Sequence, residues 1–566
     1  MGTAGCERVR VFDPVRRIRN ATPRMTPSSP APIPVMTRLQ GWRDLLHVAY
    51  LPPLMVYLAA GISGLTGIVG TFFVKEYLGL SAAFLAAIGF WAGIPWALKM
   101  PMGHLVDLLW RHKSWFVLLG ASLIASSLLI MLGLLTAPDS LRTWMPIETW
   151  YVISALLSPV GYMMQDTVAD AMTVEAVPLV DDAGNPVSPE TRRLMNTTMQ
   201  TLGRVAIIGG GVIVSLANVV LFAGVDPADQ AAAQAVYIQV YEYALVIPVV
   251  SVAGIGLAAL LRRRRTAALM RAGYSPEAAE AAVSQRGEGV TPNWWILGGS
   301  AVFLCLTLGV GTSEFAWAQE AIFAGSFAVI AFLMYRLLGE LSEESRRTLL
   351  GTAIIIFMFR AIPTSGAGST WWMIDELGFD QAFLSRLSLV ASLLTLAGLF
   401  AFRRLMAERS IVYIVVLLTV AGFVLGLPVV GMYYGLHEWT AAMTGGVVDA
   451  RFIALVDTAL ESPLGQISMV PLLAWIANSA PPHLKATFFA VMASFTNLAL
   501  SASQLGTRYL NEIFVVTREV RAATGEISLP ADYSDLGLLL ITVSGLGLGI
   551  PLLAILLTRL AGLRSA

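Results

Sequence analysis

The sequence predicts an all-α polytopic membrane protein, built from two parallel six-helix halves with an extra two-helix hairpin inserted between them. Three observations predict this class. The 566 residues are 56% hydrophobic and only 13% charged, whereas soluble domains are about 45–50% apolar and about 25% charged. Long apolar segments recur along the whole chain, and lysine and arginine gather in alternate loops between them.

A membrane-spanning helix needs about 20 apolar residues. Two of the apolar segments, 294–312 and 316–338, are separated by almost no loop, which predicts a hairpin that either crosses the membrane or lies along its surface. The sequence predicts fourteen spans in all: 51–73, 81–101, 115–136, 148–176, 194–223, 236–261, 294–312, 316–338, 349–373, 381–404, 410–431, 450–477, 485–510 and 535–561.

Basic residues in the loops predict the orientation, because cytoplasmic loops carry an excess of lysine and arginine. One set of loops holds little beyond Lys75, Arg142, Arg518 and Arg521. We therefore expect both termini in the cytoplasm and a multi-pass protein of the cell inner (plasma) membrane. The other set contains Arg111, Lys113, Arg192, Arg193, Arg262 to Arg265, Arg271, Arg286, Arg346, Arg347, Arg403, Arg404, Arg409 and Lys485.

The domain plan follows from these segments. The basic, proline-rich stretch 1–45 is interpreted as a disordered cytoplasmic tail, or as an extension ahead of a later start at Met25 or Met36. Parallel six-span halves joined by a cytoplasmic linker are typical of the major facilitator fold. The predicted parts after the tail are the N-terminal six-helix half 46–261, the cytoplasmic linker 262–293, the extra helical hairpin 294–338 and the C-terminal six-helix half 339–566.

Two short acidic blocks fall in the fourth predicted span of each half. They read Asp166-Thr-Val-Ala-Asp170 and Asp457-Thr-Ala-Leu-Glu461, so each places two acids four residues apart, on one face of a helix. Acids inside hydrocarbon are costly and mark ion paths, proton relays or substrate sites. The repeated block therefore predicts a secondary transporter in which these four acids bind protons or substrate.

Each acidic pair has alternative interpretations. Asp166 and Asp170 could bind a proton or hydrogen-bond a heterocycle, or they could form a structural pair with Arg204 of the next span. Asp457 and Glu461 repeat this argument, and Pro463 after them predicts a bend in their helix.

Basic residues inside predicted spans are candidates for holding an anion. Arg360 is the first choice for an anionic substrate group, assisted by Arg204, because a guanidinium binds a carboxylate bidentately. Its alternative role is to neutralise Asp166 or Asp457. Freed backbone groups and hydroxyls just after Arg360, from Pro363 to Ser365, are expected to face the cavity. Lys99 and Arg386, near span ends, are expected to snorkel toward the interface.

The loop after the second span reads Gly103-His-Leu-Val-Asp107-Leu-Leu-Trp-Arg111-His-Lys. It resembles the signature between helices 2 and 3 of major facilitator proteins, which implies that Gly103, Asp107 and Arg111 form a gating loop. Asp107 is expected to cap a helix N-terminus or to pair with Arg111. Glu175, near the cytoplasmic end of the fourth span, is expected to serve as a gate or in a salt bridge.

Two further patterns predict packing. Gly209-Gly210-Gly211 in the fifth span would allow another helix to approach closely. The tryptophan pairs Trp294-Trp295 and Trp371-Trp372 are expected in an interfacial aromatic belt, with ring stacking by Trp371 or Trp372 on a substrate as the alternative.

Three longer stretches resemble the folate–biopterin transporter family. They are MMQDTVADAMTVEA from Met163, FRAIPTSGAG from Phe359 with the ELGF turn ending at Phe379, and the stretch from Pro463 that contains Pro481-Pro482, ATFFA and Asn497-Leu. The resemblance implies transport of a folate- or pterin-like anion, and the hairpin 294–338 departs from it.

The predicted function is proton-coupled secondary transport of a folate- or pterin-like organic anion by alternating access, with a monomer as the working unit and the lipid bilayer as its surroundings. A permease for another organic solute and a non-transporting assembly factor are the alternatives. We expect no enzyme activity, no cofactor and no metal, since the sequence lacks zinc, phosphate-loop and dinucleotide motifs. The zero net charge gives no reason to expect a nucleic-acid partner.

Overall fold

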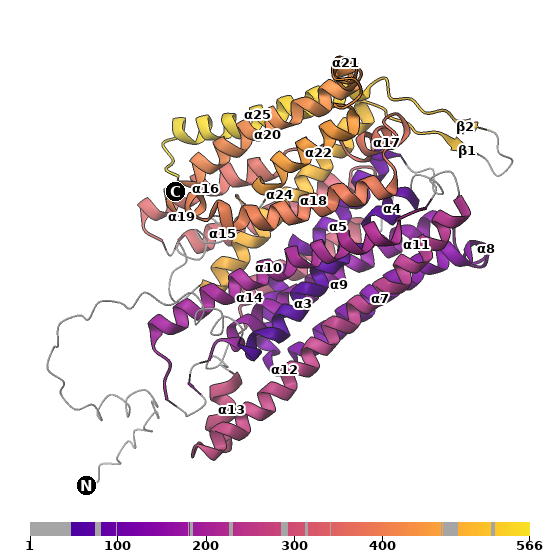
Figure 1. The fold of residues 1–566 in the computed structure, drawn as a ribbon. Helices are drawn as coiled ribbons and strands as arrows, with labels where there is room; N and C mark the ends of the chain where they lie inside the picture. The colour runs from indigo at the N-terminus through magenta and orange to yellow at the C-terminus, as the bar shows by residue number, and fades with distance from the viewer. Residues whose placement is uncertain are drawn as a thin grey trace, which may run out of the picture. The chain divides into compact units, whose positions relative to one another are not determined.

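The long helices of the chain lie side by side and run roughly parallel to one another in the computed structural model (Figure 1). Residues from Val48 onward form one compact unit, and the predicted tail 1–45 lies outside the described residues. The structure describes residues 47–73, 81–97, 99–178, 180–181, 185–225, 230–284, 292–311, 315–339, 341–465, 467, 485–521 and 527–565.

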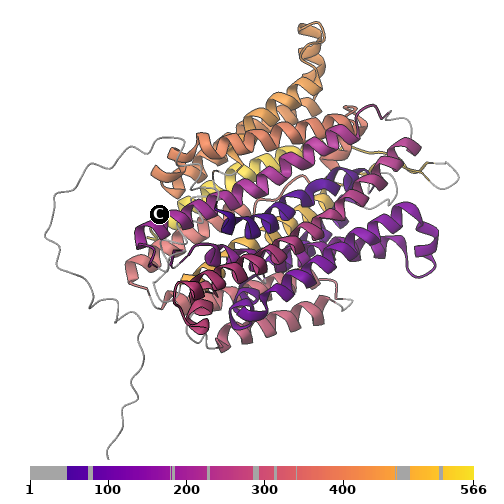
Figure 2. The ribbon, with the colours of Figure 1, turned by 60° about the horizontal axis from the view of Figure 1, so that its bottom comes forward.

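Helices dominate this unit, and a second view shows the same parallel packing (Figure 2). The N-terminal part consists of η1 (Val48–Tyr50), α3 (Leu51–Ile62), η2 (Ser63–Thr66), α4 (Gly67–Phe73), α5 (Ala82–Ala97), α6 (Lys99–Leu108), η4 (Trp110–His112), α7 (Lys113–Thr136), α8 (Pro138–Arg142), α9 (Ile147–Ala176), α10 (Pro189–Leu221), α11 (Gln230–Ala244), α12 (Val246–Arg271) and α13 (Pro276–Ser284).

The predicted hairpin follows as α14 (Trp294–Gly311) and α15 (Ala318–Leu338). A short antiparallel ribbon, in which Val520 pairs with Leu529, joins the last two long helices. The C-terminal part consists of α16 (Glu343–Arg360), α17 (Ala367–Asp375), α18 (Gln381–Ala401), α19 (Arg403–Glu408), α20 (Ile411–Tyr433), α21 (Leu436–Met443), α22 (Ala450–Glu461), η5 (Ser462–Leu464), α24 (Lys485–Ile513), β1 (Val520–Arg521), β2 (Ile527–Leu529) and α25 (Leu536–Leu560).

These helices fall where the sequence predicts membrane spans. Within the described residues, ten helices are long and apolar enough to cross a membrane, judged by length and composition, and α14 and α15 are among them. The count of fourteen stays a prediction, and part of the predicted span 450–477 lies outside the described residues.

Short polar residues set the start of several helices. In each case a side-chain oxygen of the capping residue accepts a hydrogen bond from the backbone N–H three positions later, which satisfies a donor that the helix leaves free. The capping residues are Ser188 for α10, Ser342 for α16, Asp380 for α18, Ser410 for α20 and Asp449 for α22.

Helix α3 crosses α10 at two glycines, as the glycine run predicts. A Cβ on Gly210 would lie 2.7 Å from the Cα of Gly61, so the two backbones touch. Gly209 has nothing within 4 Å of its Cβ position. Close packing therefore depends on one glycine of the run.

The N-terminal and C-terminal parts meet along two pairs of helices, α5 with α24 and α10 with α18. At the second of these seams the hydroxyls of Ser215 and Ser388 lie 2.8 Å apart. The first seam also contacts the hairpin, because Phe90 of α5, Phe303 of α14 and Ile322 of α15 belong to one buried apolar cluster.

Polar contacts tie the hairpin to both parts of the chain. The backbone N–H of Asn293, just before α14, donates to Nε2 of His104 on α6 at 2.9 Å. Near the start of α15, Glu320 accepts a hydrogen bond from the hydroxyl of Tyr509 on α24. The extra hairpin is thus joined to helices on both sides of the α5–α24 seam.

The interfacial belt stays a prediction for one tryptophan pair and is wrong for the other. Trp294 and Trp295 are exposed, whereas Trp371 and Trp372 are buried in the core. The Arg518 guanidinium lies 5.3 Å from the centre of the Trp371 ring, and the ring of Tyr433 packs on Trp372. Side chains of the protein itself therefore enclose both rings of the second pair, which also argues against their stacking on a substrate.

Candidate functional site

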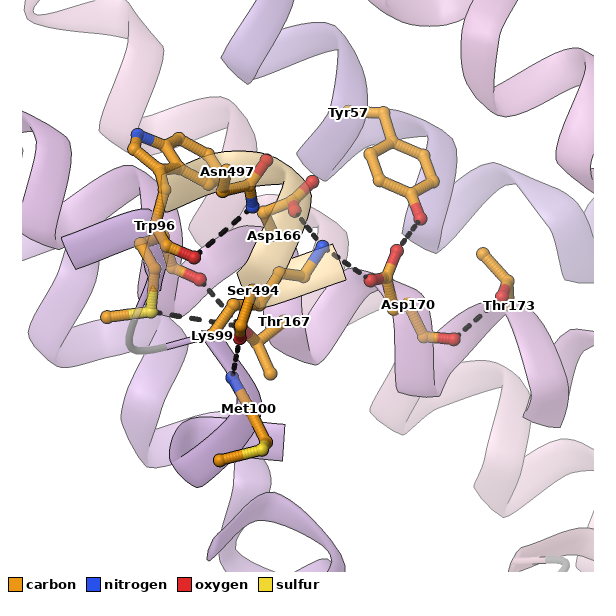
Figure 3. A network of polar contacts seen from close by, with 11 residues as sticks. Tyr57, Trp96, Lys99, Met100, Asp166, Thr167, Asp170, Thr173, Ser494 and Asn497 are labelled. Carbon is orange, nitrogen blue, oxygen red and sulfur yellow. Dashed lines mark hydrogen bonds and ion pairs between the residues drawn. The ribbon is translucent and has the colours of Figure 1, made fainter. Parts of the chain in front are cut away.

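Lys99 joins the two acids of the first acidic block (Figure 3). Its Nζ lies 2.5 Å from Oδ2 of Asp166 and 2.8 Å from Oδ2 of Asp170. The Tyr57 hydroxyl donates to the other oxygen of Asp170 at 2.6 Å. One cation and one phenol thus hold two carboxylates that belong to a single face of α9.

This arrangement corrects the expectation for Lys99. Lys99 does not snorkel to an interface, because its side chain is only 18% exposed and it is engaged by both aspartates. Arg204, the alternative structural partner of the pair, interacts electrostatically with Asp166 but forms no ion pair with either aspartate within the described residues. The only sequence signal for Lys99 was a cation that follows an apolar run, and it did not identify Asp166 and Asp170 as its partners.

The backbone that carries Lys99 is held by α24. Pro95 and Pro101 flank Lys99, and each lacks the N–H that would bond to the preceding turn. Between them, the carbonyl of Trp96 accepts from the Asn497 amide at 3.2 Å, and the N–H of Met100 donates to the Ser494 hydroxyl at 3.2 Å. Figure 3 shows both contacts beside the lysine.

Two arginines add positive charge beside this network. Arg204 on α10 is close enough to Asp166 and Tyr57 to interact with them electrostatically. It also interacts with Arg360, the last residue of α16 in the C-terminal part. The two like charges therefore come from opposite sides of the linker and are close enough to interact.

The segment after Arg360 is non-helical, and Gly366 ends it in a conformation with φ of +72° that favours glycine. Its polar groups were expected to face a cavity, but side chains of α24 bind them instead. The Ser503 hydroxyl donates to the carbonyl of Ile362 at 2.6 Å, and the N–H of Thr364 donates to Thr507 at 2.9 Å. These bonds satisfy backbone groups of the non-helical segment.

The second acidic block has different surroundings despite its matching sequence. Asp457 and Glu461 interact electrostatically with each other on α22. Oδ1 of Asp457 is buried and has no hydrogen-bond partner in the described part of the chain, and no ion pair involving either acid is found there. No direct contact among the described residues joins this block to Asp166 or Asp170.

The predicted gating loop also differs from expectation at one residue. Gly103 and Asp107 lie on α6 and Arg111 is exposed on η4, yet Asp107 neither caps α7 nor pairs with Arg111. The ion pair at this end of the helices joins Lys113 to Glu175, with a distance of 2.5 Å. Lys113 also lies 3.7 Å from the centre of the Trp110 ring. The salt bridge expected of Glu175 is therefore confirmed.

The chemistry available to this cluster is charge binding and proton transfer. Both acids, Lys99 and Arg204 lie on helices of the N-terminal part, and Arg360 comes from the C-terminal part. Among the described residues, no group of three or more histidines, cysteines and acids could hold a metal ion. Charges inside a membrane protein are typical of ion paths, proton relays and substrate sites.

The sequence profile of the BT1 family matches residues 60–562, which is most of the chain. The chain belongs to the BT1 family. A relative named folate-biopterin transporter, from Synechocystis sp., is 23% identical over 453 residues, which cover 79% of this chain and 71% of the relative. Part of the sequence resemblance, in 468–484, lies outside the described residues.

Solved structures show the same fold. A mutant of the peptide transporter POT aligns with a TM-score of 0.55 and 13% identity over 92% of this chain and 95% of its own. A mutant of the nucleoside transporter NupG aligns with a TM-score of 0.52 and 10% identity over 90% and 100%. The predicted all-α major facilitator fold is thus confirmed, and this BT1 member is a multi-pass membrane transport protein and not an enzyme.

Proposed function

We propose that this BT1 family member is a secondary active transporter that moves a folate- or pterin-like organic anion across the inner membrane by alternating access, driven by protons. The proposed working unit is a monomer with both termini in the cytoplasm. The domain boundaries predicted from the sequence and the gating loop of Gly103, Asp107 and Arg111 are part of the same proposal. One observation carries the proposal: a cluster of charged side chains lies between helices of the two parts of the chain. Its members are Lys99, Asp166, Asp170, Arg204 and Arg360.

The two neighbouring arginines support an anionic substrate. Arg204 and Arg360 repel each other in a low-dielectric setting, and an anion placed between them relieves that repulsion. The glutamate tail of a folate carries carboxylates that a guanidinium binds bidentately. A pterin ring also offers N–H donors to a carboxylate such as Asp166. The name of the Synechocystis relative, folate-biopterin transporter, supports the same class.

Proton coupling is inferred from the ion pairs that bind Lys99 to the two aspartates. Asp166 and Asp170 carry one more negative charge than Lys99, and the Tyr57 hydroxyl and the nearby Arg204 stabilise that excess. A proton that adds to Asp170 removes one of the two charges that hold Lys99 and frees the network to rearrange. Asp457, whose buried Oδ1 has no partner among the described residues, is the proposed second proton acceptor, with Glu461 beside it.

Uptake of labelled folate into proteoliposomes tests this function. A gradient of one pH unit supports about a tenfold accumulation ratio for each coupled proton, since 1.4 kcal/mol corresponds to a factor of ten. Wild type is expected to show gradient-stimulated uptake, and Asp170→Asn is expected to lose that stimulation. Asp139→Asn, which changes a carboxylate that is 95% exposed, is the control and keeps it.

Two outcomes would contradict the proposal in different ways. If well-folded wild type takes up no folate or pterin, the substrate class is wrong and other organic anions must be tried. If folate enters equally with and without the gradient in both wild type and Asp170→Asn, the proton-coupling role of the aspartate is wrong.

The anion site has its own test. Arg360→Gln is expected to raise the KM for folate by about tenfold to a hundredfold, because a hydrogen bond to a charged group contributes about 1.5–3 kcal/mol. Arg386→Gln changes an exposed arginine on α18 and is expected to leave KM unchanged. Equal KM values for the two variants, measured by initial uptake rates, would remove Arg360 from the proposed binding site.

A further inference from the structure

Two side chains of α24 reach across the α5–α24 seam and bind the backbone beside Lys99. The carbonyl of Trp96 and the N–H of Met100 are the two groups that close one turn of an α-helix. Each of them forms a hydrogen bond with a side chain of α24, since Asn497 donates to the carbonyl and Ser494 accepts from the N–H. Ser494 is fully buried, so water does not compete for its bond.

The sequence around Lys99 makes this turn depend on hydrogen bonds from α24. Pro101 deprives the carbonyl of Ala97 of its helical donor, and Pro95 does the same to Trp91. The helix is thus weakened on both sides of Lys99. Bonds from Asn497 and Ser494 then contribute a larger share of the order in this turn than they would in an unbroken helix.

The same helix binds backbone within its own part of the chain, which provides a contrast. Ser503 and Thr507 bond to Ile362 and Thr364, which lie on the same side of the linker as α24. Those bonds can persist through any rigid movement of the C-terminal part. The bonds of Ser494 and Asn497 cannot, because their partners belong to the N-terminal part and separate from α24 when the seam opens.

We infer that Ser494 and Asn497 are positioning residues, which order the Lys99 turn when the seam is closed and release it when the seam opens. Lys99 then binds Asp166 and Asp170 at the same time as the two parts of the chain close. This inference rests on the proposed alternating-access function. It assigns a role to the Asn497-Leu element of the sequence that the binding site leaves unexplained.

Disulfide cross-linking measures closure of the seam without any substrate. A Cβ built on Gly93 lies 3.9 Å from the Cβ of Ser501, and disulfides have Cβ separations of about 3.8 Å. The probe is therefore G93C with S501C, in full-length protein whose own Cys6 and Cys305 are replaced by serine. The rate of cross-linking by a mild oxidant reports how often the seam is closed.

Asn497→Leu removes the amide donor at similar side-chain volume and is expected to slow cross-linking about three- to tenfold, as loss of one hydrogen bond implies. Thr496→Val is the matched control, because the Thr496 hydroxyl bonds only to Ala493 of its own helix among the described residues. Equal rates for Asn497→Leu and Thr496→Val would overturn the role in closure.

A second measurement asks whether Asn497 acts through Lys99. The thermal midpoint of Asn497→Leu is compared with wild type, and again in a background with Lys99→Ala and Asp166→Asn, where the ion pair is gone. A positioning residue is expected to shift the midpoint in the first comparison and to have at most half that shift in the second. Equal shifts would show a merely structural role. Neither measurement requires transport, so both keep their meaning if wild type fails to take up folate.

Discussion

Lys99→Ala is expected to lower the stability of the protein by about 3–5 kcal/mol, because it leaves the largely buried Asp166 carboxylate, with Asp170 beside it, without its cation. Asp166 is 17% exposed, and its oxygen and that of Asp170 both lie within 2.8 Å of the lysine nitrogen. Without Lys99 these like charges face each other inside the protein. The expected result is a large fall in the thermal midpoint in detergent and loss of folate uptake.

Charge balance distinguishes this cause from simple loss of packing. Adding Asp166→Asn to Lys99→Ala removes one of the unpaired charges and is expected to restore much of the midpoint, though not uptake. Arg451→Ala breaks the more exposed pair with Asp380 and is expected to cost about 1 kcal/mol or less. A Lys99→Ala midpoint equal to that of Arg451→Ala would contradict the buried-network interpretation.

Gly210→Val is expected to prevent normal packing of α10 against α3. Its Cβ would lie 2.7 Å from the Cα of Gly61, and backbone cannot move aside as a flexible side chain can. Overpacking costs about 1–3 kcal/mol when side chains adjust and more when they cannot. We expect a midpoint loss of similar size to that of Lys99→Ala, measured by thermal unfolding in detergent.

The neighbouring glycine provides the control for this prediction. Gly209→Val makes the same chemical change one residue earlier on α10, where nothing lies within 4 Å of the Cβ position. Both variants carry the same change in helix propensity, so the difference between them isolates the α3 contact. Equal losses of stability would show that the glycine contact is not limiting.

The sequence was sufficient to predict the fold class, because apolar length and basic loops act locally and do not depend on tertiary contacts. It also predicted the positions of the acidic blocks and the close glycine contact. It missed Lys99 as the partner of Asp166, since Lys99 is 67 residues away and comes from another helix. Periodicity relates residues on one helix and says nothing about which neighbouring helix supplies the counter-charge.

The same limitation explains the other differences. Asp166-Asp170 and Asp457-Glu461 match in spacing, yet only the first block has a lysine beside it in the described part of the chain. Trp371 and Trp372 are buried because Arg518 and Tyr433, far away in sequence, pack on their rings. Each difference depends on long-range contacts that a single sequence does not specify.

The hairpin α14–α15 resists movement on one side of the helix bundle, at the α5–α24 seam. It is bonded to His104 on one side of the α5–α24 seam and to Tyr509 on the other, and it shares apolar clusters with both helices. Any rotation of α5 against α24 must therefore shear two additional interfaces at once. The hairpin is thus a clamp across this seam, and opening α5 away from α24 has to break its contacts to one of the two sides.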